Sequence, residues 1–485
     1  MAGITDTYLN HANEFPDKIA IQTQSEKISY SKWLELLNKT ANWLDSLNLP
    51  TKTLAILLPN GIPFLQLFTG AAAAGWTAVP FDARWTETEL QKRLRLSGTS
   101  LVITTKSRQP FLKKFFPTVY TWEDCLEEIC QAPATKAYQS EGEMPFYMGF
   151  TSGSTGEPKA FIRSQNSWVA SFDCTCFDFQ IDENDGVLIP GTLIHSHFLY
   201  GAISTLYLGG TVFLMEKFSA KHALALIESA SITVMYVVPT MIAAFIKEDH
   251  YMKKPLRILS SGAKWEENSK EEIRNVFPNL KMYEFYGASE LSFVTVLSDI
   301  DSARKPGSVG RPCHNVEIQI RRADGECAKQ NEPGKIYVKS DMIFIGYLHH
   351  NQDRVRDEHG WITVDDMGYL DEEGFLFIAG REKNMILYGG INIFPEEIEK
   401  VLSLHSDVEE AAVVGLPDPY WGQIVTAAVK GRASLSELKK ICRENLASFK
   451  IPRKWVFVDE LPHTASGKIA RPQVKDLIES KVNDH

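Results

Sequence analysis

The sequence lacks the two motifs that most often mark a nucleotide-binding protein. It has no Gly-x4-Gly-Lys-Ser/Thr run, because Pro158 precedes Lys159 and Ala160 follows it, and this disfavours a P-loop NTPase. It also has no Gly-x-Gly-x-x-Gly that opens a helix after a strand, so a dinucleotide-binding unit has no anchor. Any nucleotide is therefore bound in another way.

An excess of basic residues is also absent. The chain carries 51 lysines and arginines against 61 aspartates and glutamates, and its formal net charge is −10. Proteins that bind nucleic acid usually present a basic surface. We therefore expect no nucleic acid among the partners of this protein.

Cysteines are few and follow no pairing pattern. Seven occur in 485 residues, scattered between Cys125 and Cys442, and we expect no secretory leader. This excludes a small secreted fold held by disulfides and predicts free thiols in a reducing cytoplasm. We expect a cytoplasmic protein, either a monomer or a homodimer.

A convincing membrane span is also missing. Residues 53–81 contain no charged side chain and are long enough to be considered as a span. However, Pro59, Gly61 and Pro63 interrupt the first half, and residues 70–75 are all small. We expect a strand at 54–58, a turn and a buried helix, and no membrane span.

Short apolar runs alternate with helical patterns in the N-terminal part of the chain. Runs at 54–58, 101–104 and 187–189 indicate buried strands, whereas 30–47 and 221–230 indicate helices. Such alternation predicts a parallel α/β sheet that binds ligands at the carboxyl ends of its strands.

The pattern changes to short β-type segments after about residue 306, and a compact α/β pattern restarts at Gly380-Arg381. We predict an α/β protein with a large N-terminal domain, residues 1–380, made of parallel α/β subdomains and a small β-rich subdomain at about 306–380. A small mobile α+β C-terminal domain, residues 381–485, follows it.

One loop combines the groups that bind phosphate. Its hydroxyls, glycines and lysine are Thr151, Ser152, Gly153, Ser154, Thr155, Gly156 and Lys159. Glycine allows close approach of the backbone, hydroxyls donate to phosphoryl oxygens, and an ammonium offsets negative charge. The loop is a candidate for gripping the polyphosphate of ATP, and a flexible surface loop is the alternative.

This loop resembles the signature of the adenylate-forming enzymes, which include acyl-CoA synthetases, luciferases and the adenylation domains of peptide synthetases. Residues 283–290, Tyr-Glu-Phe-Tyr-Gly-Ala-Ser-Glu, resemble the Tyr-Gly-x-Thr-Glu motif of the same family. The resemblance implies that Tyr286 stacks against adenine and that Gly287 belongs to the ATP site. It also implies that the Ser289 hydroxyl lies near the α-phosphate and that Glu290 helps to hold Mg²⁺.

Further motifs follow in family order. The family's adenine-side loop is matched by Gly262, Ala263 and Lys264. Its thiol channel is expected to include Gly389 and Gly390. Asp366 takes the place of an aspartate that bonds both ribose hydroxyls, although Val364 and Asp365 stand where Thr-Gly is usual. Arg381 follows the family's Gly-Arg and implies a contact to ribose or phosphate, and Lys383 occupies the hinge position.

Residues 461–469 resemble the C-terminal Leu-Pro-x-Thr-x-x-Gly-Lys-Ile motif and make Lys468 the adenylation lysine. Its charge lowers the repulsion between a carboxylate and the α-phosphate. Departures from the pattern are Ala160 for a glycine, Asn384 for an aspartate and Leu387 for a lysine. Asn384 carries no charge, so the hinge or an interdomain ion pair is expected to differ.

The resemblance implies a reaction in two steps with ATP, Mg²⁺ and coenzyme A as cofactors. The acid attacks the α-phosphate to give an acyl-adenylate and pyrophosphate, and a thiol then attacks the activated carbonyl and releases AMP. The acceptor is coenzyme A or the pantetheine of an acyl carrier protein.

A histidine next to the acid is typical of the acyl-CoA synthetases. We align His195 with it, and His197 is the adjacent alternative. Apolar neighbours favour a fatty or other hydrophobic carboxylic acid, with an aryl acid such as succinylbenzoate second. The remaining alternatives are an acyl-AMP ligase that loads a carrier protein, a non-catalytic ATP-binding protein and a plain ATP hydrolase.

Overall fold

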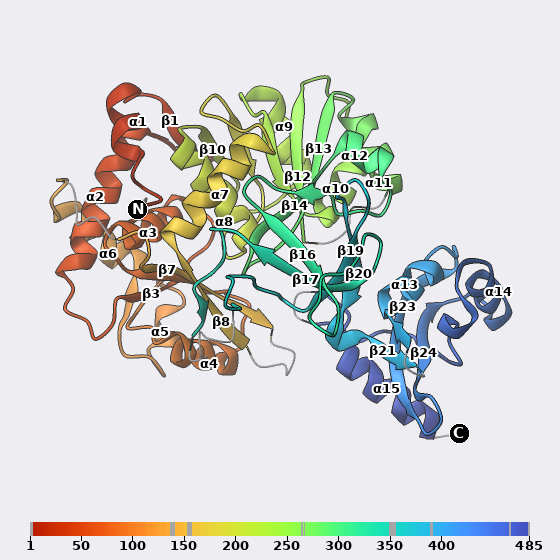
Figure 1. The fold of residues 1–485 in the computed structure, drawn as a ribbon. Coiled ribbons are helices and arrows are strands. Elements are labelled where there is room, and N and C mark those ends of the chain that lie inside the picture. The colour runs from red at the N-terminus through yellow and green to blue at the C-terminus, as the bar shows by residue number, and fades with distance from the viewer. Residues whose placement is uncertain are drawn as a thin grey trace. The chain divides into compact units, whose positions relative to one another are not determined.

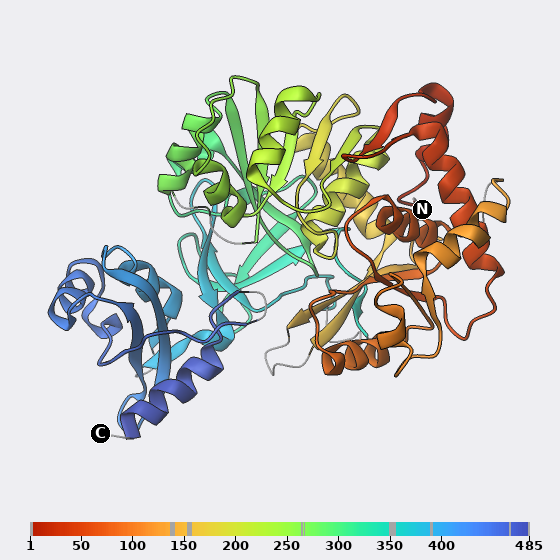
Figure 2. The same cartoon turned by 180° about the vertical axis from the view of Figure 1, so that it is seen from behind.

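The computed structural model of the chain describes residues 3–135, 141–152, 158–262, 265, 267–348, 356–388, 391–464 and 467–483. Two compact units make up the chain. Unit 1 consists of Met1–Ile318 and Val338–Ile362, and unit 2 of Gln319–Tyr337 and Thr363–His485. Both contain strands and helices (Figure 1, and Figure 2 from behind).

The first sheet of unit 1 gathers strands from distant parts of the chain. Its order is β15 (Arg311–Pro312), β14 (Ser292–Ser298), β13 (Leu280–Ala288), β12 (Leu256–Ser260), β11 (Val234–Val237), β9 (Gly186–Ile189), β10 (Thr211–Leu214), β1 (Ile19–Gln22) and β2 (Lys27–Ser29). Strands β11, β12 and β13 run parallel, and β14 returns antiparallel to β13. The carboxyl ends of β12 and β13 therefore lie side by side.

The second sheet of unit 1 ends in a hairpin, and a strand from much later in the sequence forms its edge. Its order is β18 (Gly346–Tyr347), β8 (Pro158–Ser164), β7 (Pro145–Ser152), β4 (Thr77–Pro80), β3 (Thr53–Leu57), β5 (Leu101–Thr104) and β6 (Val119–Thr121). β7 and β8 are antiparallel, and β18 pairs with β8 through Gly346–Ile162 and Tyr347–Phe161.

The helices of unit 1 pack on these sheets (Figure 1). They are α1 (Tyr8–Glu14), α2 (Tyr30–Ser46), α3 (Ile62–Ala73), α4 (Glu87–Ser97), α5 (Gln109–Leu112), α6 (Trp122–Gln131), α7 (Gln165–Phe177), α8 (Ser196–Leu208), α9 (Ala220–Ser229), α10 (Pro239–Ile246), α11 (Glu267–Val276) and α12 (Asp299–Arg304). Side-chain caps begin several of them: Thr86 caps α4 and forms a capping box with Glu89. Helix α7 contacts both β7–β8 and β14, and so connects the two sheets.

Unit 2 contains two sheets. The strand orders are β16 (Glu317–Arg321), β17 (Gly334–Lys339), β19 (Asp366–Leu370), β20 (Leu376–Arg381), and β22 (Ile391–Ile393), β21 (Ile386–Tyr388), β24 (Gly422–Gly431), β23 (Val408–Asp418), with β25 (Lys454–Phe457) beside β24. The helices are α13 (Pro395–Leu402), α14 (Leu435–Asn445) and α15 (Arg471–Asn483), with 3-10 turns at Glu382–Asn384 and Ser448–Lys450.

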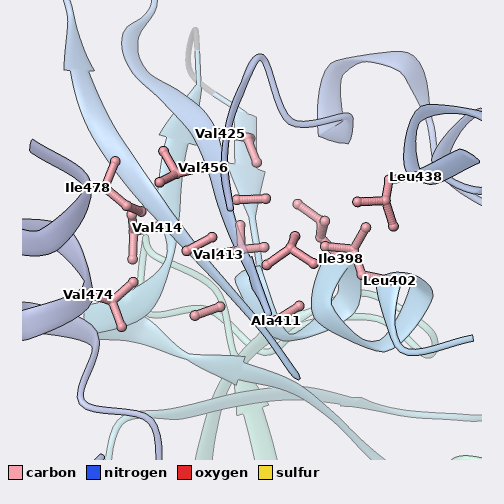
Figure 3. Packing of buried hydrophobic residues seen from close by; sticks show 14 of the residues in the cluster. Ile398, Leu402, Ala411, Val413, Val414, Val425, Leu438, Val456, Val474 and Ile478 are labelled. Carbon is pink, nitrogen blue, oxygen red and sulfur yellow. The ribbon is translucent and has the colours of Figure 1, made fainter. Parts of the chain in front are cut away.

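The core of unit 2 lies on both faces of the long hairpin β23–β24 (Figure 3). Successive residues of a strand point to opposite faces. Val413 accordingly faces Ile398 of α13, whereas Val414 faces Val474 of α15. The hairpin is thus covered on both sides, and its apolar residues are buried.

The α/β fold class is confirmed. The helix expected at 30–47 is α2, and the strands expected at 54–58 and 101–104 are β3 and β5. The charge-free stretch 53–81 folds as β3, the buried helix α3 and β4. No helix among the described residues is long and apolar enough to cross a bilayer.

Candidate active site

The expected phosphate loop is the tip of the β7–β8 hairpin. Thr151 pairs with Lys159 across the two strands, so the hairpin fixes both ends of the loop. The Lys159 ammonium lies 5.3 Å from the centre of the Tyr347 ring, within the range of a cation–π contact. Four of the expected phosphate-binding residues lie outside the described residues: Gly153, Ser154, Thr155 and Gly156. Only the backbone of Ser152 is described, as the last residue of β7.

Ser289 and Glu290 lie in the tight turn that joins β13 to β14. The turn is closed by a hydrogen bond from Leu291 N to Ala288 O at 3.0 Å. Gly287 lies on β13 just before it, and a Cβ there would lie 2.0 Å from Ser292 O, so a larger residue has no room. Tyr286, the expected adenine neighbour, precedes Gly287 on β13 and pairs with Thr295.

Glu290 is held from two directions by the segment around β18. Its Oε1 accepts a hydrogen bond from Tyr347 Oη at 2.8 Å, and its carbonyl accepts one from Phe344 N at 2.9 Å. The residue is 7 % exposed. Because Tyr347 also lies under Lys159, one aromatic ring connects the lysine of the hairpin with the carboxylate of the turn.

Two residues that sequence reasoning missed organise this region, Tyr347 and Arg163. Arg163 lies on β8, is 2 % exposed and donates to the carbonyl of Ser289 at 2.8 Å. The only local signal is a charged residue that follows the apolar run Ala160-Phe161-Ile162 on β8. Its partners are too distant in the sequence for a pattern to indicate them.

The expected adenine-side loop leaves β12 next to the end of β13. Ser261 Oγ donates to Phe285 O at 3.2 Å, which ties the loop to the neighbouring strand. Gly262 has φ of +92°, a conformation that suits glycine. Ala263 and Lys264 lie outside the described residues.

His195 and His197 stand at the amino end of α8 in different surroundings. His195 is the N-cap residue and is exposed, yet desolvation by nearby protein and then the Arg84 charge lower its pKa, while Asp82 acts in the opposite direction. His197 packs against the rings of Phe198 and Tyr236, with ring centroids 4.9 and 5.2 Å away. Its Nε2 donates to Val237 O at 3.0 Å.

The environment of His197 keeps it neutral. Burial lowers its pKa to about 4, and the hydrogen bond to Val237 opposes this only in part. Its Nδ1 is buried and has no hydrogen-bond partner among the described residues. His195 is thus the more accessible of the two rings, and His197 belongs to the aromatic packing beside it.

In unit 2, Asp366 and Arg381 form an ion pair. They are register partners at the open end of β19–β20, and Arg381 Nε lies 3.0 Å from Asp366 Oδ1. The Asp366 side chain is 8 % exposed, whereas that of Arg381 is 48 % exposed. Lys383 follows in the 3-10 turn Glu382–Asn384, which connects this sheet to β21.

Lys468 stands on a small closed turn. Thr464 N donates to Lys468 O at 2.7 Å, and Lys468 N donates to Thr464 Oγ1 at 3.2 Å. Gly467 has φ of +78°, which explains the glycine before the lysine. The turn holds the backbone of Lys468 while its side chain remains exposed. Gly389 and Gly390, between β21 and β22, lie outside the described residues.

The sequence model of the AMP-binding enzymes matches residues 9–348, and that of the AMP-binding enzyme C-terminal domain matches residues 397–468. The chain belongs to the AMP-binding enzyme family. The matched ranges of this AMP-binding enzyme include Lys159, Ser289 and Glu290 in the first and Lys468 in the second. The resemblance to the adenylate-forming enzymes is thereby confirmed.

Similar proteins are acyl-CoA ligases. This AMP-binding enzyme is 53% identical over 479 residues to an uncharacterized acyl-CoA ligase, YhfT, of Bacillus subtilis (strain 168), and 99% of each chain is covered. Its fold matches o-succinylbenzoate CoA synthetase from Bacillus subtilis in complex with the acyl-adenylate OSB-AMP, with a TM-score of 0.85, 28% identity and 96% and 97% coverage. It also matches a fatty acyl CoA synthetase of Mycobacterium tuberculosis, with a TM-score of 0.81, 26% identity and 99% of each chain covered.

Proposed function

We propose that this AMP-binding enzyme is an ATP-dependent acid–thiol ligase. It joins a carboxylic acid to ATP to form an acyl-adenylate and pyrophosphate, and it transfers the acyl group to coenzyme A with release of AMP. The observation that carries the proposal is the arrangement of Lys159 and Glu290 around Tyr347. A cation for phosphate and a carboxylate for Mg²⁺ are held there by one side chain.

The donor set fits Mg²⁺ in an ATP site. Among the described residues, no cluster of three or more histidines, cysteines and acids is placed to hold a metal by itself. Mg²⁺ usually takes one or two carboxylates and completes its shell with substrate phosphates and water. Glu290 supplies one such oxygen donor, and the ion, when bound, neutralises phosphate charge.

Each remaining ATP-binding residue has a proposed role that suits its chemistry. Lys159 and the loop 151–156 hold the β- and γ-phosphates, and Ser289 lies at the α-phosphate. Tyr286 stacks on adenine beside the loop 262–264. Asp366 accepts hydrogen bonds from the ribose hydroxyls, with Arg381 aligned by their ion pair.

The chemical step is assigned to Lys468. A carboxylate that attacks an anionic phosphate meets repulsion that grows towards the transition state, and an ammonium that touches both reduces it. We propose that residues 381–485 form a mobile domain that carries this lysine and turns about Lys383 between the two half-reactions. The large domain then comprises residues 1–380, with its β-rich subdomain at about 306–380.

The acid is a fatty or other hydrophobic carboxylic acid, with an aryl acid of the succinylbenzoate kind as the second candidate. Rings surround the start of α8, where His197 packs against Phe198, Tyr236 and Phe285. We place the acid beside His195, the accessible histidine at the amino end of the helix. A neutral imidazole and a helix amino end both suit a carboxylate.

Coenzyme A is the proposed acceptor, with Gly389 and Gly390 lining the channel for its thiol. The preceding residue, Tyr388, stacks on Trp421 with centroids 4.5 Å apart, and the Arg453 guanidinium lies 5.0 Å from the Trp421 ring centre. Flat rings beside a positive charge suit the nucleotide part of coenzyme A. A carrier-protein pantetheine is the alternative acceptor. All seven cysteines are free, in keeping with the proposed cytoplasmic location.

The test is pyrophosphate exchange into ATP, screened over fatty, aryl and amino acids with and without coenzyme A. One acid class should support exchange and yield a thioester only when coenzyme A is present. If none of the acids supports exchange, the ligase function is refuted and an ATP-binding protein remains. Release of AMP without any acid would instead indicate an ATP hydrolase.

A further inference from the structure

A buried cation joins three segments of unit 1 that are far apart in the sequence. The guanidinium of Arg163 donates from Nη1 to Ser289 O at 2.8 Å, and from Nη2 to Ser292 Oγ and Met342 O, each at 2.6 Å. Its Nε donates to Ser167 Oγ at 3.1 Å on α7. These acceptors are all uncharged oxygens, so Arg163 acts as a branched hydrogen-bond donor.

Burying the charged side chain of an arginine at this position is unfavourable. Removing a charge from water is unfavourable, and here the pKa of Arg163 falls to about 10 because of burial, which still leaves it charged at neutral pH. An apolar side chain would fill the interior without that cost. The arginine must therefore serve the geometry of its partners, because its planar fork donates in fixed directions.

Those partners bracket Glu290. Ser289 O lies on one side of it in the turn, and Ser292 Oγ lies on the other. Ser292 has φ of +61°, a conformation that residues other than glycine adopt reluctantly and that its surroundings must enforce. Met342, whose carbonyl accepts a hydrogen bond from Arg163, lies two residues before Phe344. The Phe344 N–H donates to Glu290 O. Arg163 thus forms hydrogen bonds with the turn on both sides of Glu290 and with the segment that contains Met342 and Phe344.

We propose that Arg163 is a positioning residue that holds Ser289 and Glu290 in the geometry that binds ATP with Mg²⁺. Lys159 and Arg163 lie on the same strand, so β8 carries both the phosphate-binding ammonium and the grip on the metal-binding turn. The strand therefore fixes one group relative to the other. The inference rests on the proposed function, because it assumes that this turn receives the nucleotide.

The experiment measures equilibrium binding of ATP to the full chain at a series of Mg²⁺ concentrations, without any acid, together with the melting temperature. The variants are Arg163→Lys, Arg163→Met and Ser292→Gly. Ser292→Gly tolerates the same backbone conformation, so it removes one acceptor of Arg163 without straining the turn. Arg257→Lys is the matched control: it changes a semi-buried arginine bonded to Gln180 O and Asp185 at the amino end of β12.

We expect Arg163→Lys and Arg163→Met to raise the half-saturating Mg²⁺ concentration roughly 10-fold or more, as changes behind a metal ligand commonly do. Ser292→Gly should produce a smaller rise in the same direction, and Arg257→Lys none. If the folded Arg163 variants and Ser292→Gly bind as the wild type does, Arg163 is only structural. If Arg163→Met fails to fold, the other two variants decide.

The outcomes separate this inference from the proposed function. If the wild type binds ATP with Mg²⁺ but none of the acids supports exchange, the ligase function is refuted. The binding data then still decide the role of Arg163. A wild type that binds no ATP overturns both.

Discussion

Arg381 Nε lies 3.0 Å from Asp366 Oδ1, so the first residue of β19 and the last residue of β20 form one ion pair. Asp366 is nearly buried and Arg381 is half exposed. The carboxylate is therefore held in place while the guanidinium remains accessible to a ligand.

We expect Asp366→Asn to raise the KM for ATP by roughly 10- to 100-fold, because a hydrogen bond to a charged group is worth about 1.5–3 kcal/mol. The melting temperature should change little, since the partner is exposed and screened. The measurement is pyrophosphate exchange at varied ATP, and Arg322→Gln, which disrupts the exposed pair with Asp324, is the control. An unchanged KM for ATP would contradict the ribose assignment.

Lys468→Ala should abolish adenylate formation, lowering exchange by roughly 100-fold or more, because the missing charge acts on the transition state. Thioester formation from preformed acyl-adenylate should remain largely intact. Both half-reactions are measured, with Lys440→Ala, an exposed lysine of α14, as the control. Exchange at the wild-type rate in Lys468→Ala would refute the assignment.

Gly287→Ala should destabilise unit 1 by about 1–3 kcal/mol, the usual cost of overpacking. The added Cβ would meet Ser292 O at 2.0 Å and push the turn that carries Glu290. Urea unfolding and ATP binding are the measurements, and both should deteriorate. In Gly61→Ala the nearest atom lies at 3.4 Å, and neither quantity should change by a comparable amount.

Stability should fall between about pH 6.5 and pH 4 because of His197. Its pKa is about 4 in the folded protein and near 6.5 when unfolded, so over this window only the unfolded chain takes up the proton. The loss amounts to about 3 kcal/mol at pH 4 and none above pH 7. Urea unfolding across this range should show a shallower decline in His197→Gln than in the wild type. The exposed His359→Gln should follow the wild type, and parallel curves for all three proteins would disprove the assignment.

Local patterns predicted much of the fold. The apolar runs of β3 and β5 and the helical period of α2 are properties of short segments, and short segments suffice to recognise them. The family motifs are equally local, which is why the roles of Lys468 and Glu290 could be proposed before the fold was known.

The grip of Arg163 could not be predicted in this way. Its acceptors Ser289 and Met342 lie 126 and 179 residues further along the chain, and nothing in the intervening sequence indicates that they meet it. Which of His195 and His197 takes the family position was likewise open in the sequence. Only the packing of the rings shows which histidine is enclosed.

The strand β18 has a consequence for how the chain matures. Chains are made from the amino end, and contacts between distant residues form late. When β8 leaves the ribosome, its edge partners Gly346 and Tyr347 do not yet exist, and the residues of unit 2 between Gln319 and Tyr337 must be made first. A nascent chain that ends at residue 318 lacks both the strand that pairs with β8 and Tyr347, the hydrogen-bond partner of Glu290. The hydrogen bond from Tyr347 to Glu290 can therefore form only after this edge strand has been synthesised.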